Sequence, residues 1–435
     1  MITFVPEPHL LDSPRGRDWP RPATTPRIRT DEPPGTADVV IVGAGPAGLA
    51  VASALWHLGV RDVVILDRWA RPCGRFFDRI DVLRQRVLRS PYEHHPGVEG
   101  YRDCELLDFA RLHWARLTAV ERREIRMAQS GHRSVVPVDV FEAYCRHVAT
   151  LHNVYDRTWQ ASVREVHPGA DGVAVRGDGV DVAAPFVVLC TGEERRTAPR
   201  QWWRGSGGAA PPPGVTYWDD PVPAGDGPLT VVGAGLTAAH LITNGLRDGR
   251  RVDWVLRETE ERYQCSDVNA SFFRPEGRAR FDDGIAWADR LTLMRRQRRA
   301  SVMFEFRPLL QQAEADGRLV VHRGRAVTSV TAGPTVRLAD GTGVTGEQVV
   351  LALGTEFSPG AGLLPEHLVD DRDGWPDLDE RSLCYRRAPR VFTVGATAGM
   401  VLGPAARNID GHRVATARVA GAIAARLDEA AEVRV

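Results

Sequence analysis

The stretch Ala37-Asp-Val-Val-Ile-Val-Gly-Ala-Gly-Pro-Ala-Gly48 places an apolar, valine-rich run directly before a glycine-rich turn. A helical pattern over residues 49–58 follows the turn. Gly43, Gly45 and Gly48 have the GxGxxG spacing that is typical of a dinucleotide-binding strand–turn–helix unit. The first glycine permits the tight turn, the second lets a pyrophosphate approach the backbone, and the third lets helix and strand pack closely. The stretch therefore predicts a Rossmann-like α/β domain.

An acidic residue supports this interpretation. Asp67 ends the next predicted strand, residues 63–67, and follows Gly45 by about the 20 residues that are typical of the carboxylate that accepts hydrogen bonds from ribose hydroxyls. Glycines, strand, helix and acid together favour a dinucleotide site over a merely structural turn.

The same design occurs a second time in the chain, in Leu229-Thr-Val-Val-Gly-Ala-Gly-Leu-Thr-Ala-Ala239. Gly233, Gly235 and Ala238 have the spacing GxGxxA. Arg257 ends the following predicted strand, at the position where the first unit has its aspartate. An arginine here favours a phosphorylated ribose, and hence NADPH over NADH. The alternative is a solvated arginine beside Glu258.

The repeat predicts the domain organisation. We expect an N-terminal arm that is disordered or wraps a neighbouring subunit, the first part of a dinucleotide-binding domain (the FAD-binding domain of the resemblance given below), a linker, a nested second dinucleotide-binding domain for NAD(P)H, and a tail that completes the first domain. The predicted bounds of these five parts are, in order, residues 1–36, 37–200, 201–226, 227–355 and 356–435.

Composition excludes several other functions. All 56 basic residues are arginine, so a Lys-dependent phosphate loop and Schiff-base chemistry are excluded. The net charge of zero argues against nucleic-acid and membrane-surface partners. The six cysteines form no CxxC pair, no metal-ligand cluster is evident, and no apolar run has the length of a membrane span. We therefore expect a cytoplasmic protein with reduced thiols and no metal, and a homo-oligomer is possible.

The chain resembles the flavin-dependent N-hydroxylating monooxygenases that act on ornithine or lysine. Their VNExFxPE segment is similar to Asp267-Val-Asn-Ala-Ser-Phe-Phe-Arg-Pro-Glu276, although one extra residue precedes the Pro-Glu here. The stretch Phe141-Glu-Ala-Tyr-Cys-Arg-His-Val148 is also similar to the family. The resemblance implies two Rossmann-like domains in a glutathione-reductase-like arrangement, with FAD and NADPH as cofactors.

The resemblance also implies an activity. NADPH would reduce FAD, and a flavin hydroperoxide would transfer one oxygen atom from dioxygen to the amine nitrogen of a small metabolite in specialised metabolism. Asn269 would contact substrate and nicotinamide, and Arg89 would replace the family lysine that reads the substrate carboxylate. Gly395 and Asn408 would lie where the family closes over the flavin.

Two other functions stay open. One is a flavin oxidase or dehydrogenase that takes electrons from its substrate and keeps a vestigial NAD(P)H site. The other is a non-catalytic flavin-binding redox sensor. The roles of His94 and His95 are also open, because loop histidines can contact a substrate or simply bond to the backbone.

Overall fold

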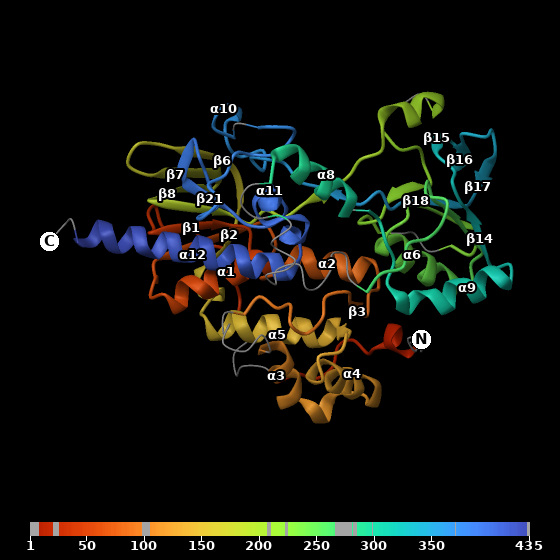
Figure 1. Cartoon of the computed structure of the whole chain (residues 1–435), viewed down its shortest axis with the longest axis horizontal. Coiled ribbons are helices and arrows are strands. Elements are labelled where there is room, and N and C mark those ends of the chain that lie inside the picture. The colour runs from red at the N-terminus through yellow and green to blue at the C-terminus, as the bar shows by residue number, and fades with distance from the viewer. Residues whose placement is uncertain are drawn as a thin grey trace.

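The structure is a computed structural model of the chain, and it describes residues 8–20, 26–97, 105–206, 210–221, 225–265, 281, 285–297, 299–369 and 371–432. Two parallel sheets form the centres of two lobes (Figure 1). Among the described residues, no helix combines the length and the apolar character that crossing a membrane requires.

The first sheet is built around the valine-rich run quoted above. This run forms strand β1 (Val39–Val42). It pairs in parallel with β2 (Val63–Asp67) on one side and with β9 (Phe186–Leu189) on the other. All four residues of β1 are buried because both faces of the sheet are covered. The strand order is β20 (Cys384–Tyr385), β21 (Ala388–Thr393), β9 (Phe186–Leu189), β1 (Val39–Val42), β2 (Val63–Asp67) and β5 (Thr158–Gln160).

Helices cover one face of the first sheet, and a small antiparallel sheet covers the other. Helix α1 (Pro46–His57) is rich in alanine and begins with a proline, and α12 (Ile409–Glu432) runs alongside it (Figure 1). The small residues of α1 let this helix lie buried between the sheet and the other helices. The small sheet contains β6 (Ser162–Pro168), β7 (Val173–Asp178) and β8 (Val180–Ala184).

The second lobe repeats this layered design. Its parallel sheet has α6 (Leu236–Arg247) and α9 (Arg307–Ala315) in the hydrophobic core on one face. A three-stranded antiparallel sheet packs on the other face. The parallel order is β11 (Val215–Tyr217), β18 (Gln348–Leu351), β12 (Leu229–Val232), β13 (Val252–Val255) and β14 (Leu319–His322), and the small sheet contains β15 (Val327–Thr331), β16 (Thr335–Leu338) and β17 (Gly343–Thr345).

The remaining elements connect and cover these layers. Helix α8 of the second lobe packs on α11 of the first. The short strands are β3 (Val87–Leu88) with β4 (Val136–Pro137), and β10 (Glu194–Arg195) with β19 (Thr355–Glu356). The other helices are α2 (Gly74–Val82), α3 (Glu105–Leu112), α4 (Ala119–Gln129), α5 (Val138–Leu151), α8 (Trp287–Gln297), α10 (Glu366–Val369) and α11 (Gly399–Leu402).

The chain passes between the lobes twice, and β10 and β19 pair antiparallel at this crossing. After the second crossing the chain returns to the first sheet, where β21 pairs in parallel with β9. Strand β11 belongs to the second sheet although it lies in the stretch predicted as a linker. The predicted α/β class with two Rossmann-like domains is confirmed, and the residue bounds of the five parts stay a prediction.

Part of the N-terminal arm packs on its own chain. Residues 8–20 contact both lobes, and the fate of the whole arm stays a prediction. Trp19 is 2% exposed, and its Nε1 donates to Asp139 at 2.7 Å. Leu10 and Leu11 belong to the core of the second lobe. The sequence did not indicate this packing because the arm has no periodic apolar pattern.

Candidate cofactor and substrate site

A cavity of about 660 Å³ lies at the carboxyl ends of the parallel strands. Its wall includes residues that follow β1, β2, β9 and β21 in the first lobe, and Leu236 and Thr237 at the start of α6 in the second. Ligands of open α/β sheets bind at this edge, outside the carboxyl ends of the strands. The volume lies within the range of small-molecule and cofactor pockets.

The first glycine turn forms one end of the cavity. Gly43 has a φ of +103°, and a Cβ added there would lie 2.5 Å from the carbonyl oxygen of Cys190. A Cβ on Gly48 would lie 1.9 Å from the carbonyl oxygen of Gly43. A Cβ on Gly45 would meet nothing within 4 Å, and Gly45 lines the cavity. Gly43 and Gly48 thus hold the turn tightly, while Gly45 leaves its backbone open to a ligand.

Asp67 lines the cavity at the end of β2. Its carboxylate accepts a hydrogen bond from the backbone N–H of Ala44 in the glycine turn and one from Trp69 at 2.9 Å. Burial raises the pKa of Asp67, and the two N–H donors oppose that rise. The structure therefore connects the predicted ribose acceptor directly to the turn.

The second glycine turn leads into the same cavity, which Leu236 and Thr237 line at the start of α6. Gly233 has a φ of +142°, and a Cβ there would lie 2.2 Å from the carbonyl oxygen of Ala352. A Cβ built on Gly235 would have room, because the nearest described atom, Ala300 Cβ, would be 3.9 Å away. Ala238 is fully buried. Since α6 begins at Leu236, its N-terminal end faces the cavity. The N-terminal end of a helix is a favourable place for a phosphate.

Arg257 lies two residues beyond β13, which ends at Val255. Its side chain is 82% exposed, and its guanidinium is 3.6 Å from Glu258. It does not line the cavity described above. A ligand that extends past the α6 end could reach this exposed cation, and the phosphate role stays a prediction.

Gly395 and Asn408 both line the cavity, and their predicted place over the flavin stays a prediction. Gly395 follows β21 with a φ of +103°, and Asn408 directly precedes α12. His412 lies one turn into α12, where its backbone N–H donates to the carbonyl oxygen of Asn408 at 2.9 Å. The tail thereby supplies one wall of the cavity.

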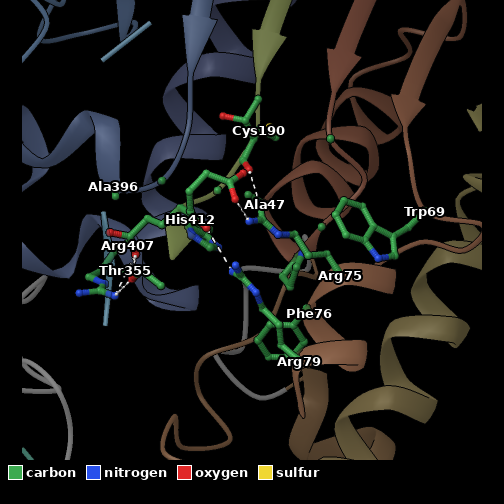
Figure 2. A pocket seen from close by; sticks show the side chains of 18 of the residues that line it. Ala47, Trp69, Arg75, Phe76, Arg79, Cys190, Thr355, Ala396, Arg407 and His412 are labelled. Carbon is green, nitrogen blue, oxygen red and sulfur yellow. Dashed lines mark hydrogen bonds and ion pairs between the residues drawn. The ribbon is translucent and has the colours of Figure 1, made fainter. Parts of the chain in front are cut away.

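Arginines line the cavity in fixed positions (Figure 2). Arg79 donates to Asp219 and to the carbonyl of Glu193, both at 3.1 Å. Arg407 is 2.8 Å from the carboxylate of Glu193. Arg75 donates to the carbonyl of Thr191 at 3.4 Å. These contacts hold positive charge near the place where a dinucleotide carries its phosphates.

Arg89 lines the cavity and also joins the two lobes. Its guanidinium donates to Ser301 Oγ at 2.9 Å and to the carbonyl oxygens of Ser301 and Gln264 at 3.2 and 3.3 Å. A substrate carboxylate would therefore meet an arginine that already has protein partners. Its predicted role as a substrate contact stays a prediction.

Asn269 and the two loop histidines remain to be considered. Asn269 and its segment, residues 267–276, fall outside the described residues. His94 is buried with its Nε2 3.6 Å from Asp410, and burial lowers its pKa to about 4. His95 Nδ1 is 3.2 Å from the hydroxyl of Tyr144. Neither histidine lines the cavity.

Sequence comparison identifies the first lobe. Residues 36–194 match a protein family described as an FAD binding domain. The chain contains an FAD-binding domain. FAD is therefore confirmed as a cofactor of this flavoprotein. A comparison with curated protein sequences finds no match.

Solved structures share the fold of the flavoprotein over most of its length. Ornithine hydroxylase from Pseudomonas aeruginosa has a TM-score of 0.70 at 18% identity, covering 90% of this chain and 100% of that one. The FAD-bound cadaverine monooxygenase from Erwinia amylovora has 0.68 at 16%, covering 89% and 94%. Bacillithiol disulfide reductase from Bacillus cereus has 0.57 at 17%, covering 90% and 99%. The predicted likeness to N-hydroxylases is thus confirmed in the fold.

The residues of the cavity fit FAD. The turn at Gly45 leaves a cradle that a Cβ would fill, and the backbone of Gly192 is equally open. Asp67 stands at the end of β2, where a ribose acceptor is expected. The arginines described above can face phosphates without loss of their own partners.

Several cavity residues were missed by the sequence analysis. The described cavity residues that we did not predict include Trp69, Arg75, Arg79, Glu193, Thr355, Arg407 and His412. The sequence could have indicated one of them, His412, because it follows the predicted residue Asn408 by four positions, which is about one helical turn. The others reach the cavity from turns and helix faces whose direction depends on tertiary packing.

We predict that Asp67→Ala weakens FAD binding at least tenfold, because the cofactor loses its ribose acceptor and the turn loses the bond to Ala44. The measurement is the dissociation constant of FAD, from fluorescence quenching. Asp62→Ala is the matched control, since Asp62 is exposed at the opposite end of the same strand. Equal affinities of wild type and Asp67→Ala would contradict the assignment.

Proposed function

We propose that this protein is an NADPH-dependent FAD monooxygenase that transfers one oxygen atom of dioxygen to the amine nitrogen of a small metabolite. One observation carries the proposal: Gly45 of the first glycine turn and Leu236, which directly follows the second turn at the start of α6, line one cavity. Two dinucleotides bound at these turns would meet in that cavity, as hydride transfer between them requires.

The chain's own residues would bind, orient and exclude water. Bound FAD supplies the redox chemistry that activates dioxygen. The glycine turns and the N-terminal ends of α1 and α6 would bind the two pyrophosphates. Apolar side chains of the wall, among them Leu66, Ile80 and Leu88, would keep water away from the reacting groups.

The alternative of an oxidase with a vestigial second site has less support. The second turn keeps the strained backbone of Gly233 and an open approach at Gly235. Disulfide reduction, the activity named for one protein of the same fold, is also disfavoured. Among the described cavity residues Cys190 is the single cysteine, and burial raises the pKa of its thiol.

The proposal is tested by rapid mixing of the anaerobic flavoprotein with NADPH, followed by oxygen and a panel of amines. We expect NADPH to bleach the flavin, and an amine product to gain the mass of one oxygen atom. Flavin that NADPH does not reduce would refute the proposal. Reduction by an amine in the absence of NADPH would favour the oxidase.

We predict that Arg257→Ala raises the KM for NADPH by roughly ten- to hundredfold and leaves the KM for NADH unchanged. A hydrogen bond to a charged group contributes about 1.5–3 kcal/mol, and only NADPH carries the extra phosphate. Arg251→Ala is the matched control, because this exposed arginine precedes β13 at its opposite end. Equal changes for both nucleotides would remove the phosphate role.

We also propose that Arg89 and Asn269 contact the substrate. Arg89→Ala is expected to weaken the binding of amines that carry a carboxylate by about tenfold or more, and that of plain diamines much less. The measurement is the substrate Kd from perturbation of the flavin spectrum. Arg84→Ala is the control, because it removes another contact between the lobes, Arg84–Asp248 at 2.6 Å, outside the cavity. Wild-type affinity in Arg89→Ala would show that the residue is not a substrate contact.

A further inference from the structure

His412 is a cavity residue that neither the glycine motifs nor the proposed substrate contacts account for. It lies on the first turn of α12 and lines the cavity, where Figure 2 shows it near Arg407. Its Nδ1 is buried and forms no hydrogen bond of normal geometry with the described residues, although the backbone of Arg407 is close enough to the ring to affect its pKa. A buried polar atom without a partner costs free energy, so such an atom in a ligand cavity points to a missing ligand group.

The other ring nitrogen lies near the backbone of Gly395. A Cβ built on Gly395 would lie 3.8 Å from His412 Nε2, and among the described residues, the two chain neighbours of Gly395 aside, no other atom comes within 4 Å of that position. Gly395 has a φ of +103°, a conformation that residues with a side chain disfavour. The absence of a side chain at residue 395 thus leaves room beside Nε2.

Burial favours the neutral form of the ring. Burial lowers the pKa of His412 to about 4, while Glu193 and the backbone of Arg407 oppose that fall. The carboxylate of Glu193 is occupied by Arg407 at 2.8 Å and by Thr355 at 3.2 Å. A neutral imidazole offers one donor and one acceptor, which suits hydroxyl, carbonyl or ring-nitrogen groups better than phosphates.

The order of the strands indicates which half of FAD reaches His412. Asp67 follows β2 on one side of β1, and the glycine turn that faces the pyrophosphate follows β1 itself. Gly395 follows β21, which lies on the other side of β1, beyond β9. A cofactor with its adenosine ribose at Asp67 and its pyrophosphate at β1 extends its flavin half toward β9 and β21.

We propose that His412 forms a hydrogen bond with the flavin half of FAD and so positions the ring system in the cavity. His412 is thus a cofactor-positioning residue. The inference depends on FAD binding and is independent of the oxygen-transfer reaction, so loss of the proposed activity would leave it standing.

The test compares FAD with ADP, which has the adenosine and pyrophosphate but no flavin half. We expect His412→Leu, in the full chain stripped of FAD, to bind FAD about tenfold more weakly, which corresponds to 1.4 kcal/mol. ADP affinity, measured by competition with FAD, is expected to stay unchanged. His412→Gln, which can still donate and accept, should recover part of the FAD affinity. Asp67→Ala should weaken both ligands.

His240→Leu is the matched control. His240 is also buried with an unpartnered nitrogen and a pKa lowered by burial to about 3, but it packs on Phe306 outside the cavity. It should bind FAD like wild type. If His412→Leu does not fold, His412→Phe keeps a planar ring and makes the same test.

Two results would overturn the proposal. One is FAD affinity in the folded His412 variant within twofold of wild type. The other is an equal loss of FAD and ADP affinity, which would mean that the substitution acts on the whole cavity. An unshifted absorption spectrum of the bound flavin, together with unchanged affinity, would reinforce the first result.

Discussion

The architecture depends on a steric constraint at the two strand-to-helix turns. A Cβ at Gly48 would lie 1.9 Å from the carbonyl oxygen of Gly43, and a Cβ at Gly233 would lie 2.2 Å from that of Ala352. Because the backbone passes so close to these glycines, there is no room for a side chain there. Each helix therefore begins immediately over its own sheet, with its N-terminal end toward the cavity. The cavity, its position at the carboxyl ends of the strands and its ability to face phosphates all follow from this close packing.

The charge distribution follows from an all-arginine set of basic residues. Arginines in the cavity wall are held by carboxylates and backbone carbonyls, as Arg79 is by Asp219 and Arg407 by Glu193. A guanidinium has five donors, so it can keep such a partner and still face a ligand. The same property lets Arg89 join the two lobes while it lines the cavity.

Much of the fold could be predicted from sequence, because it is encoded in short local patterns. Apolar runs before the turns at Gly43 and Gly233 predicted the two central strands, and the repeat predicted two similar lobes. The ordered arm could not be predicted in this way. Trp19 is buried in the core of the first lobe and donates to Asp139, a residue far away in the chain, and no local pattern records such contacts.

For the site, the sequence by itself determined the glycine turns, Asp67 and the order of strand, turn and helix, because each depends on backbone geometry within a few dozen residues. Only the tertiary structure decided which side chains meet in the cavity. The return of β21 to β9 brings Gly395 and His412 beside residues more than 200 positions earlier. Packing between layers sets those positions. The contact between the lobes likewise brings Arg89 to Ser301, to which its guanidinium donates a hydrogen bond.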